Sequence, residues 1–219
     1  MEAWAIVVAG GSGTRFGRPK QYAVLGGRRL IDWALEAARA ACQGVVVVVP
    51  QSDVASMVEF GADGVVGGGA TRSASVRAGL TVVPASAEVI VVHDAARPLA
   101  GPGLWSAVLS ALAAGAEAVV PAVAVSDTIK RVSSDGEVLE TLGRSELVAV
   151  QTPQGFRADV LRAAHRSGAD ASDDAALVEA AGGRVVVVPG DPHNLKITDP
   201  ADLELAEVLL ARRDGHGTT

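Results

Sequence analysis

The segment that decides the fold is WAIVVAGGSGTRFGRPKQ, residues 4–21, in which an apolar run ends in a glycine-rich loop. Residues 4–9 have the length and composition of a buried strand. The glycines that follow allow backbone N–H groups to approach an anion closely. In open α/β sheets, ligands bind at the carboxyl ends of the strands, where this loop would lie. The segment therefore predicts a strand of a parallel sheet followed by a phosphate-binding loop.

The rest of the chain repeats the alternation of strand and helix. Apolar runs of strand length lie at residues 45–49, 89–92, 118–123 and 185–188, and alanine-rich amphipathic stretches separate them. This pattern predicts right-handed βαβ units. We therefore expect an α/β fold with three layers, in which helices cover both faces of a Rossmann-like, mostly parallel sheet. Residues 1–219 would form a single domain, and its last helix would begin after Asp199.

Residues 126–148 interrupt this rhythm. Two short β-branched segments flank Ser133-Ser134-Asp135-Gly136, which is typical of a β-hairpin turn. A hairpin inserted in a parallel sheet exposes apolar residues unless something packs on it. We predict an arm that embraces another subunit. The residues alone leave a hairpin folded back on its own domain equally open.

Composition excludes several classes of protein. The formal net charge is -6, so the broad basic face that nucleic acid or anionic lipid requires is not expected. The longest valine runs are far shorter than the ~20 apolar residues of a membrane helix. A single cysteine, Cys42, and no export signal indicate a reducing compartment, and we expect a cytoplasmic protein.

The loop after the first strand carries the strongest chemical signal. It has neither the G-x-G-x-x-G spacing of dinucleotide-binding loops nor the Gly-Lys-Ser/Thr of a Walker A loop. Arg15 and Lys20 add two positive charges, which favours a triphosphate or pyrophosphate ligand. The alternative is a glycine-rich turn whose basic residues are simply solvated.

Asp94 lies at the end of the apolar run at 89–92, in the sequence His93-Asp94-Ala95-Ala96-Arg97-Pro98. This position places it in the crevice beside the first loop, where it could bind Mg²⁺ or orient a hydroxyl. Alternatively, Asp94 caps the next turn and forms a structural ion pair with Arg97. We interpret His93 as a hydrogen-bonded structural residue.

Two weaker signals fall elsewhere. Glycines and hydroxyls at residues 67–76 could admit a flat base that Ser75 reads, although a flexible loop with Thr71 or Ser73 capping a helix explains the same residues. Lys196 follows the last strand and could reach a phosphate, or it could be a surface lysine. Residues 151–156 and 172–174 have the composition of polar turns at helix starts.

The motifs at residues 9–21, 93–98, 127–128, 151–156 (QTPQGF) and 194–198 (NLKIT) together resemble the 2-C-methyl-D-erythritol 4-phosphate cytidylyltransferase family. The match runs in order along almost the whole chain. The resemblance implies CTP and a sugar-alcohol phosphate, methylerythritol phosphate, as substrates. It also implies Mg²⁺ as cofactor, a homodimer whose arms complete the neighbouring active site, and the non-mevalonate isoprenoid pathway.

The resemblance also assigns residues. The charge-stabilising pair falls on Arg15 and Lys20, and the residue near the sugar hydroxyls and metal falls on Asp94. Catalytic positions further include Lys196 and, from the other subunit, Arg144. The nucleotide-binding positions are Ala9, Gly10, Gly11, Gly13, Thr14, Arg15, Lys20 and Ser75. The substrate-binding positions are Asp94, Arg97, Thr128, Arg144, Ser172 and Lys196.

The chain departs from the family pattern at three positions. Ala70 and Gly143 stand where relatives often carry Asp, and His193 stands where an acidic residue is common. Two other functions remain compatible with the sequence: a cytidylyltransferase that takes ribitol 5-phosphate, and a regulatory module that binds CTP without turnover. Arg15 and Lys20 opposite Asp94 favour an enzyme over the regulatory module.

Overall fold

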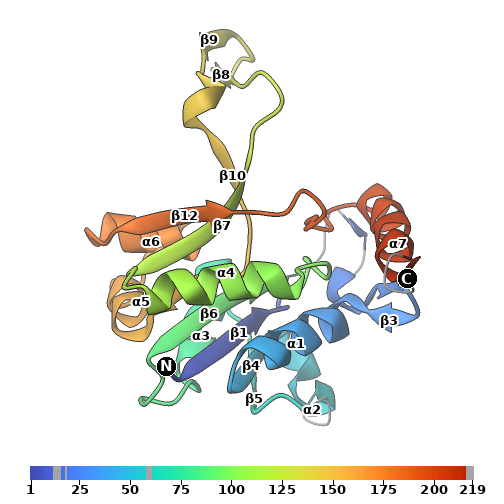
Figure 1. The fold of residues 1–219 in the computed structure, drawn as a ribbon, viewed down its shortest axis with the longest axis vertical. Coiled ribbons are helices and arrows are strands. Elements are labelled where there is room, and N and C mark those ends of the chain that lie inside the picture. Colours follow the sequence, from blue (N-terminus) through green and yellow to red (C-terminus); the bar gives the residue numbers. More distant parts are fainter. Residues whose placement is uncertain (12–15, 18, 58–60, 216–219) are drawn as a thin grey trace.

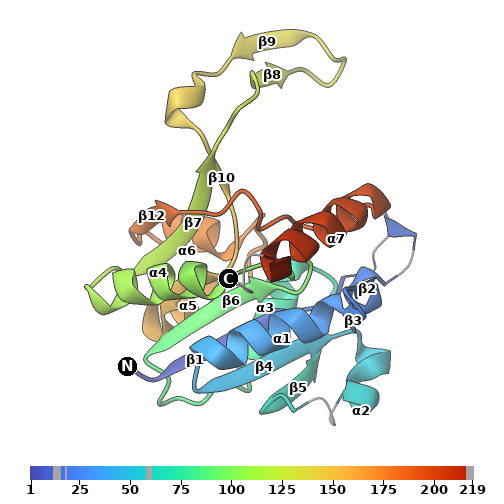
Figure 2. The ribbon, with the colours of Figure 1, turned by 45° about the vertical axis from the view of Figure 1, so that its right-hand side comes forward.

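The computed structural model describes residues 1–11, 16–17, 19–57 and 61–215. Within these ranges the chain forms an eight-stranded mixed sheet whose strand order is β10-β7-β11-β6-β1-β4-β5, with β12 beside β7. The figures show this sheet between two helical layers (Figures 1 and 2). In the same ranges, no helix combines the length and the apolar character that a membrane crossing requires.

The predicted strands are all present. They are β1 (Ala3–Val8), β4 (Gly44–Val49), β6 (Val89–Asp94), β7 (Ala118–Ala124) and β12 (Val185–Pro189). Strands β4, β1 and β6 pair in parallel, as do β12 and β7. The sheet gains three strands that were not predicted, β5 (Gly64–Gly67), β10 (Val148–Val150) and β11 (Gln154–Arg157). The last two run antiparallel to their neighbours.

Alternation along each central strand produces the three layers. Ala5 and Val7 of β1 face one apolar cluster and Ile6 faces the other, and β4 and β6 alternate in the same way. The first cluster is covered by α1 (Leu30–Ala41) and α4 (Pro102–Ala113). The second is covered by α3 (Arg72–Leu80), α5 (Ala158–His165) and α6 (Asp174–Ala180). Both faces of the sheet are therefore buried, as predicted.

A third apolar cluster fastens the chain end to the body. Helix α7 (Pro200–Gly215) contributes Ala206 and Leu210 to this cluster, which also holds Leu25 of the short β2–β3 ribbon (Val24–Leu25 and Arg28–Arg29). Asp199 caps α7 by accepting hydrogen bonds from its first turn, so the predicted start of the last helix after Asp199 is confirmed. A further short helix, α2 (Val54–Met57), lies beside β5.

The predicted hairpin is present and projects away from the body (Figure 1). Its strands are β8 (Lys130–Val132) and β9 (Val138–Thr141), and every residue of both is exposed. Gly136 has φ +83° and its N–H donates to the Ser133 carbonyl, which closes the turn. The alternative of a hairpin folded back on its own domain is therefore wrong.

One prediction for the polar motifs is wrong and another is confirmed. Residues 154–157 form a strand rather than a turn, because Phe156 and Gln154 are buried between β6 and β7. Residues 172–174 do start a helix, since Asp173 caps α6 and accepts from the N–H of Ala176.

Candidate active site

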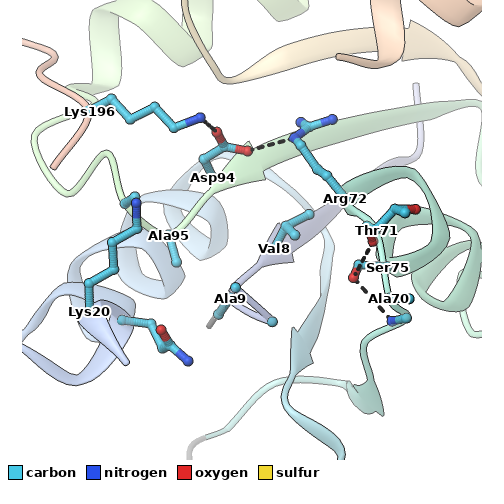
Figure 3. A pocket seen from close by; sticks show the side chains of 15 residues that line it. Val8, Ala9, Lys20, Ala70, Thr71, Arg72, Ser75, Asp94, Ala95 and Lys196 are labelled. Carbon is cyan, nitrogen blue, oxygen red and sulfur yellow. Dashed lines mark hydrogen bonds and ion pairs between the residues drawn. The ribbon is translucent and has the colours of Figure 1, made fainter. Parts of the chain in front are cut away.

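A cavity of about 470 Å³ opens at the carboxyl ends of β1 and β6 (Figure 3). It is lined by the end of β1, the described part of the glycine loop, the loop before α3, the end of β6 and Lys196. Three of its lining side chains are cations and one is a carboxylate: Lys20, Arg72, Lys196 and Asp94. The cavity lining is therefore positive although the whole chain is acidic.

Glycines bring two loops together on one side of this cavity. A Cβ added to Gly68 would lie 2.9 Å from Ser75 Oγ, and one added to Gly10 would lie 3.5 Å from the same atom. The Ser75 hydroxyl accepts from the Gly69 N–H and donates to the Thr71 carbonyl. Ser75 thus lines the cavity and also shapes its wall. Thr71 caps α3, so the capping interpretation of this segment is correct as well.

Asp94 occupies the centre of the site. Its Oδ1 lies 3.1 Å from Arg72 Nε and its Oδ2 lies 2.8 Å from Lys196 Nζ. Lys196 is held there because the N–H of the buried Ile197 donates to the Ala96 carbonyl, two residues beyond Asp94. The sequence prediction that Lys196 reaches the crevice is confirmed. The alternative interpretation, an ion pair between Asp94 and Arg97, is wrong, because Asp94 pairs with Arg72 and Lys196 instead.

These ion pairs set the charges of the site. Burial raises the pKa of Asp94, but the positive charges of Arg72 and Lys196 lower it by a larger amount. The resulting pKa is well below the ordinary range. Burial likewise lowers the pKa of Arg72, but the Asp94 and Asp174 carboxylates raise it above its usual value. Asp94 is therefore ionised at neutral pH and able to bind a cation or accept a hydrogen bond.

His93 has the structural role that the sequence predicted. Its Nδ1 lies 3.0 Å from Thr152 Oγ1, and its Nε2 lies 3.2 Å from the Arg97 carbonyl. The Arg97 carbonyl can only accept, so the proton of the neutral imidazole is on Nε2. Nδ1 then accepts from the Thr152 hydroxyl, which itself accepts from the Asp94 N–H. Burial lowers the pKa of His93 to about 4. The neutral imidazole fixes the end of β6, from which Asp94 projects.

A second cavity of about 210 Å³ adjoins the first on the side of the arm. Asp94, Arg72 and Lys196 line both cavities, and Arg97 and Ser172 line the second. The guanidinium of Arg97 donates to the carbonyls of Asn194 and of Val150. Arg97 therefore connects the Lys196 loop to the base of the arm.

Two predicted residues lie away from both cavities. Thr128 and Arg144 are on the exposed arm, and Arg144 Nη1 donates to the Ser126 carbonyl at 2.6 Å. Within one chain the arm does not reach its own site. Of the nucleotide-binding residues, Ala9, Gly10, Gly11 and Lys20 line the first cavity. Gly13, Thr14 and Arg15 lie outside the described residues.

Asp94 is also the residue that suits the expected Mg²⁺. Among the described residues, no cluster of three or more His, Cys, Asp or Glu side chains could enclose a metal ion. Mg²⁺ at nucleotide sites is commonly held by one or two carboxylates together with substrate phosphates. An ionised carboxylate on the wall of a phosphate-sized cavity fits that mode of binding.

Sequence reasoning missed Arg72 and Asp174. Arg72 Nη1 lies 2.7 Å from Asp174 Oδ2, although 102 residues separate the two in the chain. Arg72 stands three residues after Gly69, the last glycine of the segment at 67–69, and an arginine at that point was a signal that could have been used. Asp174 carries no such signal, because its sequence resembles any helix start.

The comparisons with known proteins agree with this geometry. The sequence model of the family described as 2-C-methyl-D-erythritol 4-phosphate cytidylyltransferase matches residues 3–212. A relative of that name from Nocardia farcinica is 46% identical over 217 residues, which cover 95% of this chain and 94% of the relative. The Bifunctional enzyme IspD/IspF of Clavibacter michiganensis is 45% identical over 227 residues, which cover 97% of this chain and 55% of the relative. This chain thus spans about half of that bifunctional protein.

A solved structure gives the same result. The 2-C-methyl-D-erythritol 4-phosphate cytidylyltransferase of Thermus thermophilus superposes with a TM-score of 0.80 at 38% identity, covering 94% of this chain and 98% of that one. The mostly parallel sheet predicted from the sequence is thereby confirmed. From its sequence, its fold and the arrangement of this cavity, the chain belongs to the 2-C-methyl-D-erythritol 4-phosphate cytidylyltransferase family.

Proposed function

We propose that the chain transfers CMP from CTP to 2-C-methyl-D-erythritol 4-phosphate, giving CDP-methylerythritol and pyrophosphate in non-mevalonate isoprenoid biosynthesis. The observation that carries the proposal is the cavity at the ends of β1 and β6, where Lys20, Arg72 and Lys196 surround Asp94. Such a lining suits two polyanionic substrates that must come together. The family membership identifies which two.

The reaction needs no nucleophile from the protein. An oxygen of the acceptor phosphate attacks the α-phosphorus of CTP, and the bond from that phosphorus to the bridging oxygen of the β-phosphate breaks. Pyrophosphate leaves with the electron pair. A phosphate monoester is already an anion near pH 7, so catalysis consists of positioning and of stabilising charge in the transition state.

Each residue then has a defined task. Lys20, and Arg15 with it, stabilises charge that builds on the phosphate oxygens, and the glycine loop donates backbone N–H groups to the triphosphate. Ser75 bounds the space for cytosine. Asp94 accepts a hydrogen bond from a hydroxyl of the acceptor and would hold Mg²⁺, which would neutralise charge on the triphosphate. Lys196, Arg97 and Ser172 bind the acceptor on the side of the second cavity.

The arm supplies the remaining substrate contacts in this proposal. Thr128 and Arg144 are exposed on a hairpin that leaves its own body, so they would reach the acceptor phosphate of a second copy. The active form would be a homodimer, joined through residues 126–148, that works in the cytoplasm. The exposed apolar residues of the arm support this assembly: Val132, Val138, Leu139 and Val148.

A pyrophosphate-release assay on the purified full chain tests the proposal. We expect release with CTP, Mg²⁺ and 2-C-methyl-D-erythritol 4-phosphate, and much slower release when UTP or ATP replaces CTP. Faster release with ribitol 5-phosphate would reassign the acceptor. Binding of CTP without release of pyrophosphate under any of these conditions would reject the enzyme and favour a CTP-sensing module.

A further inference from the structure

A chain of charged and polar groups runs from the core into the active site. His165 Nε2 lies 2.9 Å from Asp174 Oδ1, and Asp174 Oδ2 lies 2.7 Å from Arg72 Nη1. Arg72 Nε contacts Asp94, which contacts Lys196 (Figure 3). We call these five residues the buried ion-pair chain. It joins α5 and α6, which are adjacent in the sequence, to α3, to β6 and to the segment of Lys196, which are far from them in the sequence.

The two ends of the buried ion-pair chain differ in exposure. The side chains of His165 and Asp174 are 2% and 0% exposed, those of Arg72 and Asp94 are 22% and 11% exposed, and that of Lys196 is 44% exposed. The buried end is enclosed by protein and cannot rearrange without disturbing the core. The lysine end faces the cavity and is able to change partners. The two contacts of Asp94 therefore differ in how easily they break.

Stability alone does not explain the buried end. A carboxylate taken fully out of water loses several kcal/mol of solvation, and a buried ion pair often contributes no more to stability than apolar residues of similar size. Asp174 at 0% exposure carries that cost. What it provides is a second fixed contact for Arg72, whose planar guanidinium is thereby held at two of its nitrogens.

We infer that Arg72 and Asp174 are positioning residues for Asp94 in the reaction. When an acceptor phosphate enters, Lys196 leaves Asp94 for the phosphate, and Arg72 keeps the Asp94 carboxylate in place. Asp174, backed by His165, keeps Arg72 in place in turn. This inference rests on the proposed function, because it concerns how Asp94 meets its substrate.

The guanidinium is essential to this arrangement. Its Nε contacts Asp94 while its Nη1 contacts Asp174, and a single ammonium at the same site cannot make both contacts with the same geometry. Arg72→Lys should therefore fail to restore activity, although it keeps the positive charge.

Steady-state pyrophosphate release by the full chain, with both substrates varied, tests the inference in a double-mutant cycle. We expect Arg72→Gln to lower kcat at least ~30-fold and Asp174→Asn to lower it about 10-fold, with KM for CTP changed less than about threefold. Because Asp174 acts through Arg72, the double variant should match Arg72→Gln within about twofold. Multiplied losses in the double variant, or wild-type kcat in Asp174→Asn, would overturn the inference.

Arg77→Gln is the matched control. Arg77 lies on the same helix and pairs with the exposed Asp170, outside both cavities, so this variant should keep kcat within about twofold of wild type. Circular dichroism identifies any variant that does not fold. If Arg72→Gln does not fold, Arg72→Lys takes its place in the double-mutant cycle. The kcat of folded Asp174→Asn then tests the inference by itself, since a wild-type value would overturn it. Inactive wild-type protein would instead reject the proposed function.

Discussion

Lys20 brings a positive charge into the first cavity from a short, well-anchored turn. The 3₁₀ turn η2 (Lys20–Tyr22) is fastened on one side by the Tyr22 hydroxyl, which donates to Asp53 Oδ2 at 2.6 Å. Gln21 in the same turn is buried and lines the cavity. The turn therefore presents the lysine from a fixed backbone. A cation that is fixed before the substrate arrives has little reorganisation left at the moment of reaction.

Lys20→Ala should lower kcat at least ~100-fold, which is the usual effect of removing one preorganised donor. The measurement is pyrophosphate release at saturating CTP and acceptor. Arg157→Ala is the control. Arg157 is an exposed residue at the end of β11, where the strand pairs with Val89 of β6, and Val89 lies at the opposite end of β6 from Asp94. A folded Lys20→Ala protein with less than a tenfold loss would contradict the assigned role.

His93 makes the stability of the fold depend on pH. Its pKa is lowered from 6.5 to about 4 by burial, so between these values the unfolded chain binds a proton that the folded chain does not. Stability therefore falls as pH falls through this window. The loss attributable to His93 between pH 7 and pH 5 is about 2 kcal/mol, at 1.36 kcal/mol per pKa unit. The lowered pKa of Asp94 also makes stability depend on pH, but only at pH values below this window.

Urea unfolding at pH 7 and pH 5 measures this effect. His93→Gln retains a donor and an acceptor without titrating, so its stability should change by about 2 kcal/mol less than that of wild type over the same interval. Equal pH dependence in both proteins would show that the imidazole is not held neutral.

The elements of this fold differ in how readily the sequence reveals them. Strands β1 and β4 are continuous apolar runs, and so is β6 as far as Val92. All three pack apolar side chains on both faces, and that composition is enough to predict them. Strand β11 is short, and it begins with the polar Gln154. It is a strand because β6 and β7 flank it on both sides, which is a tertiary effect that local composition does not contain.

The same distinction applies to the site. Asp94 and Lys196 could be predicted because each follows a strand that ends at the ligand edge of the sheet. The pairing of Arg72 with Asp174 depends on α3 and α6 packing on the same face of the sheet, which no local motif specifies. The actual partners of Arg97, two backbone carbonyls, are equally a product of the folded chain.

The arm is the element with the clearest unmet packing requirement. Val138 and Leu139 on β9 are 56% and 60% exposed, on a hairpin that contacts little of its own body. Burying one such side chain at an interface contributes about 1.5–3 kcal/mol. Leu139→Lys should therefore raise the dimer dissociation constant at least ~10-fold in sedimentation equilibrium, with no change in the folded monomer.

Val208→Lys provides the comparison for this experiment. Val208 is an exposed valine on α7, away from the arm, and its replacement tests whether any new surface charge weakens association. Unchanged dimerisation of Leu139→Lys, or equal weakening by both variants, would place the dimer interface elsewhere.

At the scale of the whole molecule, charge is distributed unevenly. The chain carries a formal charge of -6, yet the cavity lining has three cations and one carboxylate. An acidic body with a positive cavity concentrates attraction for anions at one place and disfavours nonspecific binding of polyanions elsewhere. The phosphate groups of approaching substrates would therefore be attracted to the cavity at the carboxyl ends of β1 and β6.

The proposed dimer divides each active site between two chains. Mixing two impaired variants tests that division, with the acceptor held far below the KM of Arg144→Ala so that both variants are nearly inactive alone. Lys20→Ala damages the body of the chain that carries it, whereas Arg144→Ala damages the site that its arm enters. In a heterodimer of the two, one site receives both defects and the other receives neither. With equal mixing, half the dimers are heterodimers, so about a quarter of wild-type activity should return after co-expression or subunit exchange.

Arg144→Ala alone should raise KM for the acceptor and leave CTP binding nearly unchanged, because Arg144 would contact only the acceptor phosphate. The decisive comparison is between the mixture and the summed activity of the separate variants. Recovery in the mixture requires that Lys20 and Arg144 of different chains act at one site. A mixture no more active than that sum, with heterodimers confirmed by native mass spectrometry, would show that each chain completes its own site.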